Sequence, residues 1–491
     1  MKHMVMICIV VHTILPGSML SAAEPPLELS VREAVETALV QNLGLRLRKE
    51  DVAFAEGTAE AAEGDFDTQL FADIGVGGER NNPPTLITAT DERSGTWNAG
   101  ASKRLTSGTE VELRWNNDGL NTDSPVFLFD PVYQNKASVS VVQPLLRGRG
   151  EAVQTADLEA ARSNLAARGF LVDSEAADLA AQVKNAYWEL VFAHQNLEVL
   201  QLSLQLAEQL LDETETRIDA GTLALIDLYQ PQAEVAQREQ DLIGGERAIG
   251  VAEDNLKLLL NSDNWLIPFA PTDLPSTQPI EPAIEVVLDN ALANRPDIKA
   301  SELQIQATEF EVKKAENDTL PALDLFGSAG FGGTADNYGN TFDKAVNDAD
   351  TQWQLGLRIS RPLDNSFARG RYRQSVAQLN SNRTSLALLK QEIRRSVKVT
   401  VRDVELALKA IEATTKTALA NRKRLEAEQV KFEAGRATTL DVLIAQQDFS
   451  TALSTENRAK VAYAQTLAEL DRIQGIITLD DTAAAPASDA K

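Results

Sequence analysis

The chain has 491 residues, a formal net charge of −25, 5% aromatic residues and a single cysteine. So acidic a chain is not expected to bind nucleic acid or anionic lipid surfaces, because like charges repel. Cys8 lies in segment 1–23, where an apolar run is followed by small residues that end at Ala23. We expect a secretory signal peptide here, since the apolar run is shorter than the roughly 20 residues of a membrane anchor.

Removal of this segment leaves a mature chain with no cysteine and with His194 as its one histidine. Thiolate ligands, disulfides and histidine-based metal clusters are therefore excluded, and no cofactor is expected. We interpret His194 as a packed or solvated side chain, which is commoner than a ligand or a base.

The rest of the chain divides into two similar series of elements, which we interpret as two repeats. The expected domains are a signal peptide (1–23), N-terminal helices (24–64), β-barrel strands and loops (65–145) and a long helical hairpin (146–260) of the first repeat, a proline-rich connector (261–282), short helices (283–318), β-barrel strands and a loop (319–363) and a long helical hairpin (364–475) of the second repeat, and a disordered tail (476–491).

Each repeat begins with short amphipathic helices and continues with strands. In the second repeat Pro296 breaks the helix, because a helix normally ends before the residue that precedes proline. Strands are indicated by alternation: Trp353, Leu355 and Leu357 are separated by Gln354 and Gly356. The stretch 327–350 is expected to contain a glycine- and aspartate-rich loop.

The alternation predicts strands with one apolar and one polar face. Such strands suit the wall of a membrane β-barrel, and equally a soluble antiparallel sheet with one buried face. About four to six strands cannot close a barrel of useful bore, so the membrane interpretation requires several copies of the chain. A possible hairpin at Thr106-Ser107-Gly108 leaves four or six strands open.

Each strand block is followed by a long helical hairpin. Between Pro362 and Pro486 the chain has no proline, and the apolar residues of the first helix fall on alternating steps of three and four, as in a coiled coil. A helix of about 68 residues would be on the order of 100 Å long. One constant offset aligns Gly221 with Gly435 and Asp227 with Asp441 without a gap. The hairpins are therefore duplicates that turn at glycine, where positive φ is expected.

In the first hairpin the returning helix contains Pro231 near its start and Gly244-Gly245 inside it. These residues predict a kink in that helix, because proline and glycine pairs are common causes of helix kinks.

Several short motifs accompany this order of elements: Asn294-Arg295-Pro296-Asp297, Gln143-Pro144-Leu145-Leu146-Arg147-Gly148, Ala186-Tyr187-Trp188-Glu189-Leu190, and the two glycine turns, each followed six residues later by aspartate. In these features nearly the whole mature chain resembles the TolC family of outer-membrane efflux channels. The resemblance implies a mainly helical fold with membrane strands, in which duplicated coiled-coil hairpins form a trimeric α-barrel joined to a β-barrel shared between three subunits.

The resemblance also implies a location in the outer membrane, extending into the periplasm. The implied partners are two further copies of the chain, a periplasmic adaptor protein, an inner-membrane transporter and outer-membrane lipid. The implied function is a passive conduit in a tripartite efflux or type I secretion system, gated at the helical tip, with small molecules or polypeptides as cargo.

The resemblance assigns roles to residues near the two turns. Asp441, with Asp227, is the candidate pore constriction, although Ile444 replaces the family's second aspartate. Arg436, Phe432 and Asp227 are candidates for a latch of the closed state. In the family the latch has a tyrosine where this chain has Phe432 and an arginine where it has Ala437. Gly221, Thr222, Gly435 and Arg436 are the candidates for tip turn and adaptor contact.

Physical chemistry supports two interpretations of the aspartates. Carboxylates gathered on a threefold axis repel one another and should bind cations or retain protons. Alternatively, Asp441 and Asp227 cap the helices that follow the turns.

Two other functional classes are alternatives. A non-conducting periplasmic coiled-coil scaffold would be a soluble protein, unlike a channel. An enzyme is disfavoured, because the mature chain lacks cysteine and shows no glycine-rich phosphate loop or nucleophile elbow.

Overall fold

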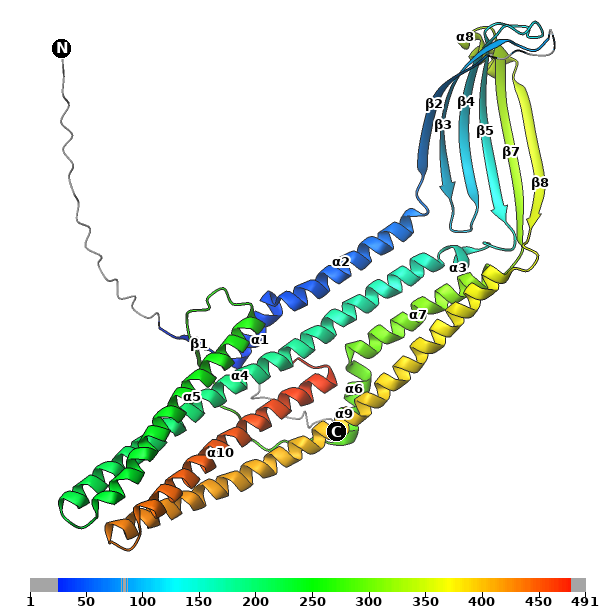
Figure 1. Ribbon diagram of the computed structural model, residues 1–491. Coiled ribbons are helices and arrows are strands. Elements are labelled where there is room, and N and C mark those ends of the chain that lie inside the picture. Colours follow the sequence, from blue (N-terminus) through cyan, green and yellow to red (C-terminus); the bar gives the residue numbers. More distant parts are fainter. Residues whose placement is uncertain (1–24, 81, 83–84, 86, 478–491) are drawn as a thin grey trace, which may run out of the picture.

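The computed structural model describes residues 25–477 except 81, 83–84 and 86. The predicted signal peptide and most of the predicted tail lie outside the described residues. A curved β-sheet stands at one end of a long rod of helices, and both helical turns lie together at the far end (Figure 1). Short helices, sheet strands and a long helical hairpin follow one another in this order twice, which is the arrangement that the duplicated sequence predicts.

The first repeat contains β1 (Leu27–Leu29), α1 (Val31–Gln41), α2 (Leu43–Gly64), β2 (Gln69–Arg80), β3 (Asp91–Arg104), β4 (Glu110–Thr122), β5 (Val132–Pro144), α3 (Glu151–Gln154), α4 (Ala156–Asp219), a 3₁₀ helix (Leu225–Leu228), α5 (Tyr229–Leu260) and β6 (Phe269–Pro271). The second contains α6 (Ile284–Asn294), α7 (Pro296–Asn317), β7 (Ala322–Ala335), α8 (Tyr338–Asn347), β8 (Asp350–Ser360), α9 (Ser366–Glu433) and α10 (Thr439–Gln474). None of the described helices is long and apolar enough to cross a membrane.

Two segments are more regular than the sequence indicates. The stretch 327–350 holds most of β7 and all of α8, whose first turn is capped by the Asn337 side chain, so the loop expected here is limited to the short links between these elements. α5 is continuous through Gly244-Gly245, so these glycines do not end the helix, and the kink stays a prediction. A Cβ atom at Gly245 would lie 2.7 Å from Cδ1 of Leu200 on α4. Glycine at this position thus permits close helix packing instead of breaking the helix.

The sheet has six antiparallel strands in the order β2-β3-β4-β5-β7-β8. The hairpin near Thr106 joins β3 to β4, so the sheet of one chain has six strands and not four. Direct cross-strand pairs such as Ile74 with Trp97 and Ala329 with Trp353 place the apolar residues on one face. α8 covers part of this face, where Tyr338 packs on Trp97, and the rest is open, since Ile74 is 85% and Trp353 81% exposed. Within one chain, β2 and β8 are the edges of the sheet.

The helices form a curved layer with two edges. Next to the sheet the helices follow the order α2, α4, α7, α9, and toward the turns the order is α5, α4, α10, α9. α9 is therefore one edge along its whole length, and α2 and α5 together form the other.

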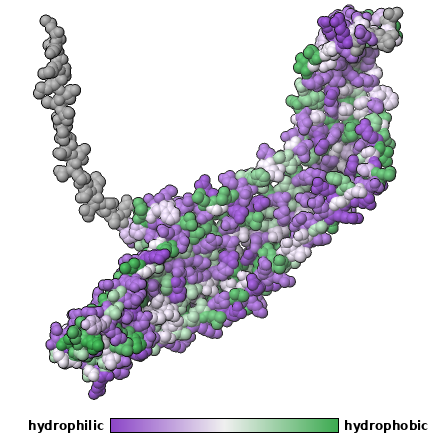
Figure 2. Space-filling view, viewed as in Figure 1, coloured by the Kyte–Doolittle hydropathy of each residue, from purple (hydrophilic) through white to green (hydrophobic). Residues whose placement is uncertain are grey.

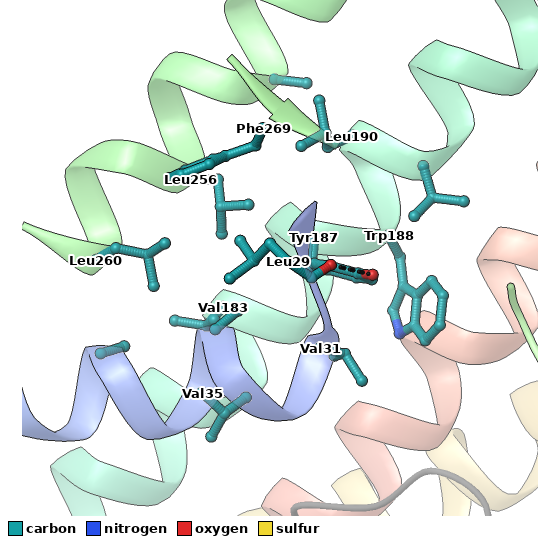
Figure 3. Packing of buried hydrophobic residues seen from close by; sticks show 14 of the residues in the cluster. Leu29, Val31, Val35, Val183, Tyr187, Trp188, Leu190, Leu256, Leu260 and Phe269 are labelled. Atoms are coloured by element: carbon teal, nitrogen blue, oxygen red, sulfur yellow. Dashed lines mark hydrogen bonds between the residues drawn. The ribbon is translucent and has the colours of Figure 1, made fainter. Parts of the chain in front are cut away.

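Two apolar cores hold the middle of the rod together. The first core contains Tyr187 and Trp188 of α4 together with Leu256 and Phe269, and the Trp188 ring lies on the far side of Tyr187 from Leu256 and Phe269 (Figure 3). The Tyr187 hydroxyl donates to the Leu29 carbonyl at 3.0 Å and accepts from the Asp273 N–H at 3.0 Å. Its surroundings raise the pKa of Tyr187 to about 12, chiefly because burial disfavours the phenolate.

The second core is the coiled-coil seam of α9 and its partners. The predicted seam is confirmed for its buried members Val397, Val401, Val404, Ile411, Ala418, Leu425 and Phe432. Leu408 is partly buried, whereas Thr415 is exposed, so its predicted place in the seam is wrong. The steps of three and four residues therefore report correctly which face of α9 is covered by α10 and the short helices.

Candidate functional site at the two helical turns

The two turns have the same backbone geometry. Gly221 has φ +75° and Gly435 has φ +69°, the left-handed conformation that favours glycine. The N–H groups of Thr222 and Arg436 donate back to the carbonyls of the residues five positions earlier, at 2.9 and 2.7 Å. This is the hydrogen bond of a glycine-terminated helix, so both glycines end a long helix at its turn. The Thr222 hydroxyl adds a bond to the Arg217 carbonyl at 2.8 Å.

Asp441 forms a capping box at the start of α10. Its carboxylate accepts hydrogen bonds from the backbone N–H and the hydroxyl of Thr438, at 2.8 and 2.7 Å. The helix cap itself is Thr438, and Asp441 lies three residues later. The Thr438 hydroxyl bond, together with the backbone bond, lowers the pKa of the exposed Asp441 carboxyl.

Asp227 occupies the matching place in the first hairpin. Its carboxylate accepts a hydrogen bond from the Ala224 N–H at 3.2 Å, at the start of the 3₁₀ helix. Both aspartates therefore stabilise the chain just after a turn, but from the third helical position and not as the N-cap that the capping interpretation expects. This local bonding occupies one side of each carboxylate.

A contact between the two hairpins centres on Phe432. This side chain is 2% exposed and lies in an apolar cluster with Leu210 of α4 and Val442 of α10. The Arg217 guanidinium lies 4.2 Å from the centroid of its ring, and Arg217 Nη1 donates to the Phe432 carbonyl at 2.7 Å. A second guanidinium nitrogen of Arg217 forms an ion pair with Glu213 at 2.6 Å. Arg217 thus ties α4 to the end of α9.

The predicted latch residues are not brought together in one chain. Among the described residues, Arg436 forms no ion pair with Asp227 or with another carboxylate. Phe432 has Arg217 as its cationic neighbour instead. One signal in the sequence could have found Arg217: the offset between the hairpins aligns it with Lys431, so both helices carry a basic residue four positions before the turn glycine.

The end of the rod presents apolar side chains to solvent. Leu225, Ile226 and Tyr229 are 63%, 73% and 64% exposed, and Leu440 and Ile444 are about half exposed. Figure 2 shows hydrophobic side chains gathered at this end, beyond a mostly hydrophilic rod. An exposed apolar group of this kind beside the turns is typical of a surface that contacts another protein.

Known proteins are similar to this chain in sequence and in fold. The family model described as "outer membrane efflux protein" matches residues 71–262 and 287–475. The outer membrane protein TolC of Vibrio cholerae is 21% identical over 308 residues, covering 62% of this chain and 69% of that protein. The pyoverdine export outer membrane protein OpmQ of Pseudomonas putida is 25% identical and covers 60% of this chain and 62% of that protein. The sequence matches thus span about two thirds of these relatives.

Solved structures share the fold over a larger part of the chain. The outer-membrane channel OprN has a TM-score of 0.71 at 18% identity, covering 91% of this chain and 89% of that one. The open state of the Neisseria gonorrhoeae MtrE outer membrane channel has a TM-score of 0.65 at 18% identity, with coverages of 91% and 89%. At such identities the likeness establishes the arrangement of sheet and hairpins.

Proposed function

Because this chain belongs to the outer membrane efflux protein family, we propose that it is the outer-membrane channel of an export system. Copies of the chain join their sheets into one β-barrel and their helices into a tunnel that extends into the periplasm. Cargo passes through this conduit without chemical change, and the chain has no catalytic role.

The proposal rests mainly on one observation: the sheet and the layer of helices each have two unpaired edges, and these edges lie on the same two sides of the chain. β8 and α9 form the edge on one side of the molecule, whereas β2, α2 and α5 form the edge on the other side. Two different edges can join only head to tail, and a ring is the closed form of such an interface. We propose a homotrimer, in which three six-stranded sheets would enclose an aqueous channel.

The faces of the sheet fit this assembly. The apolar face, which includes Ile74, Leu113 and Trp353, would meet outer-membrane lipid. The opposite face carries polar groups such as the ion pair of Glu112 with Arg114, at 2.6 Å, and would line water. Closure also removes both unpaired edges, which lipid could not hydrate.

The side chains along the edges of the helical layer also fit the proposed ring of copies. α2 exposes Leu47 (69%) and Phe54 (79%), which are seven residues apart on one face. α9 exposes Leu388 (58%) and Leu406 (53%) on its outer edge. Apolar residues on the two opposite edges would bury one another between neighbouring copies.

We place the gate at the periplasmic end, where the two turns lie. Asp441, with Asp227, would narrow the entrance in the trimer, because both residues lie close to the turns and Asp441 is exposed and Asp227 partly exposed. Within the described part of a single chain neither Arg436 nor Asp227 has an ionic partner, so a latch between them and Phe432 would form across copies. Gly221, Thr222, Gly435 and Arg436, beside the exposed Leu225 and Ile226, would contact a periplasmic adaptor protein that recruits an inner-membrane transporter.

Detergent extraction, mass measurement and planar-bilayer recording test the proposal together. We expect the protein to sediment with outer membranes, to be released by detergent as a trimer, and to conduct ions after insertion. A water-soluble monomer that never conducts would overturn the proposed function.

A further inference from the structure

α9 is positively charged, although the chain as a whole is acidic. It holds 15 basic and 7 acidic residues, in a chain with a net charge of −25. Five of the basic residues recur at seven-residue steps, and all five are exposed; we name them the basic stripe: Arg395, Arg402, Lys409, Lys416 and Lys423.

The basic stripe lies on the free edge of the helical layer. Each of its members comes two residues before a buried seam residue, as Lys409 comes before Ile411 and Lys416 before Ala418. Two residues correspond to about 160° around an α-helix, so the stripe faces away from α10. A wall helix in a ring meets its second neighbour on this side.

The basic stripe is poorly neutralised within the chain. Arg395, Lys409 and Lys423 form no ion pair with any described residue. Arg402 approaches the adjacent Asp403 only at 4.0 Å, and Lys416 pairs with the exposed Glu412 at 2.5 Å. Exposed pairs of this kind contribute little, so the stripe remains an unmatched row of positive charge.

α5, the helix at the opposite edge of the chain, carries the complementary charge. On α5, Glu239, Glu246 and Asp254 are exposed and form no ion pair within the described part of the chain. Arg247 is the one exposed basic residue of that helix. Glu239 and Glu246 are also seven residues apart, which matches the step of the basic stripe.

Heights along the rod can be compared by counting residues from the turns. The contact of Arg217 with Phe432 shows that the two turns are level, because these residues lie four and three positions before their glycines. Arg424, 11 positions before Gly435, donates to Asp448, 13 positions after it, at 2.6 Å. Equal counts on the two sides of a turn therefore mean equal height, to within about 3 Å for two helical residues.

By this measure the basic stripe of α9 and the acidic row of α5, which consists of Glu239, Glu246 and Asp254, lie at matching heights. Counted back from Gly435, the positions of Lys416, Lys409 and Arg402 are −19, −26 and −33. Counted forward from Gly221, the positions of Glu239, Glu246 and Asp254 are +18, +25 and +33. Rotation about an axis along the rod keeps these heights unchanged. Every copy in a ring thus brings the basic stripe of α9 level with the acidic row of its neighbour's α5.

We propose that neighbouring copies are joined along the periplasmic half of the wall by ion pairs of Lys416 with Glu239, Lys409 with Glu246, and Arg402 with Asp254. This inference rests on the proposed function, because it needs a ring of copies. A second copy of the chain is the partner that best fits the basic stripe, because both its charge and the heights of its acidic residues match. The row of pairs fixes the register of α9 against α5, as flanking charges do in coiled coils.

Charge exchange tests the inference with the full-length protein in detergent. One variant is K409E/K416E, a second is E239K/E246K, and a third combines all four substitutions. We expect each double variant to raise the dissociation constant of the assembly about tenfold or more at low salt, and the fourfold variant to restore wild-type assembly. The wild type should also dissociate more readily as salt rises, because salt screens exposed charges.

A matched control reverses two basic residues of α9 that lie off the stripe, R394E/R422E, and should leave assembly unchanged. The inference is wrong if the double variants assemble like the wild type, or if the fourfold variant assembles no better than they do. Double variants that assemble normally but lose export would assign the stripe to a partner protein or to anionic cargo. A wild-type monomer would instead reject the proposed function itself.

Discussion

The guanidinium of Arg217 covers the ring of Phe432 at 4.2 Å and donates to the Phe432 carbonyl at 2.7 Å, which ties the two hairpins together one helical turn from their tips. The contact combines a cation–π interaction with a charge-assisted hydrogen bond. Interactions of these kinds together stabilise a partly buried site by about 1–3 kcal/mol. Separation of the hairpins at the tip must break this contact.

Replacement of Arg217 by alanine should therefore loosen the contact between the two hairpins at the tip. We expect R217A to raise single-channel conductance in planar bilayers and to increase proteolysis at the turns. The control is K431A, which removes the aligned basic residue of the second hairpin. Conductance of R217A equal to that of the wild type would exclude Arg217 from the closed state.

Asp441 has two separable roles in our proposal, as a helix cap and as part of the pore. D441N should lose block of the channel by multivalent cations, since the neutral amide does not attract them. T438A should keep the block although it weakens the cap, typically by about 0.5–2 kcal/mol. Unchanged block by trivalent cations in D441N would reject the pore role, and equal loss in both variants would assign the effect to the cap.

Asp441 also gives a pH dependence with a definite sign. Its carboxyl has a lowered pKa in the folded chain because Thr438 donates to the charged form. The carboxylate therefore stabilises the tip above the ordinary pKa of 3.8, and this contribution disappears as pH falls through the folded value. Proteolysis at the turn should rise on acidification in the wild type, and this rise should be smaller in D441N.

The main lines of the fold follow from local sequence patterns. A constant offset between the two halves of the chain identifies the duplicated hairpins, and the steps of three and four residues in α9 identify the face that holds Val397 and Val404. Glycine at the turns was predictable because few other residues adopt positive φ. These signals lie within single elements, where spacing alone carries the information.

Contacts between elements were not predictable in the same way. Periodicity indicates which face of a helix is covered, but not which hairpin covers it, so the partner of Phe432 could not be identified. α8 was missed because glycine and aspartate dominate its surroundings. It is stabilised by packing of Tyr338 on Trp97 and of Phe342 on Trp115, and both tryptophans come from strands of the first repeat, far away in the sequence.

Tyr187 should give a measurable dependence of stability on alkaline pH. Its pKa is raised from 10.0 to about 12, so folding stabilises the neutral phenol. This contribution is fully present below pH 10 and is lost as pH rises toward about 12. Thermal unfolding of Y187F should lack that alkaline loss and should be destabilised by about 1–3 kcal/mol at neutral pH, because the Asp273 N–H loses its acceptor. Y229F, at an exposed tyrosine, should behave like the wild type.

Gly244 and Gly245 are neighbours in α5 with opposite surroundings, which makes them a matched pair. A Cβ atom at Gly245 would lie 2.7 Å from Leu200 Cδ1 and 3.1 Å from Leu197 Cδ1, whereas none of the described atoms beyond its own helix lies within 4 Å of one at Gly244. G245V should therefore cost about 1–3 kcal/mol through overpacking against α4. G244V should be nearly neutral or slightly stabilising, because valine is a somewhat better helix former than glycine. Thermal unfolding in detergent measures both, and equal effects would show that α5 does not pack on α4 through Gly245.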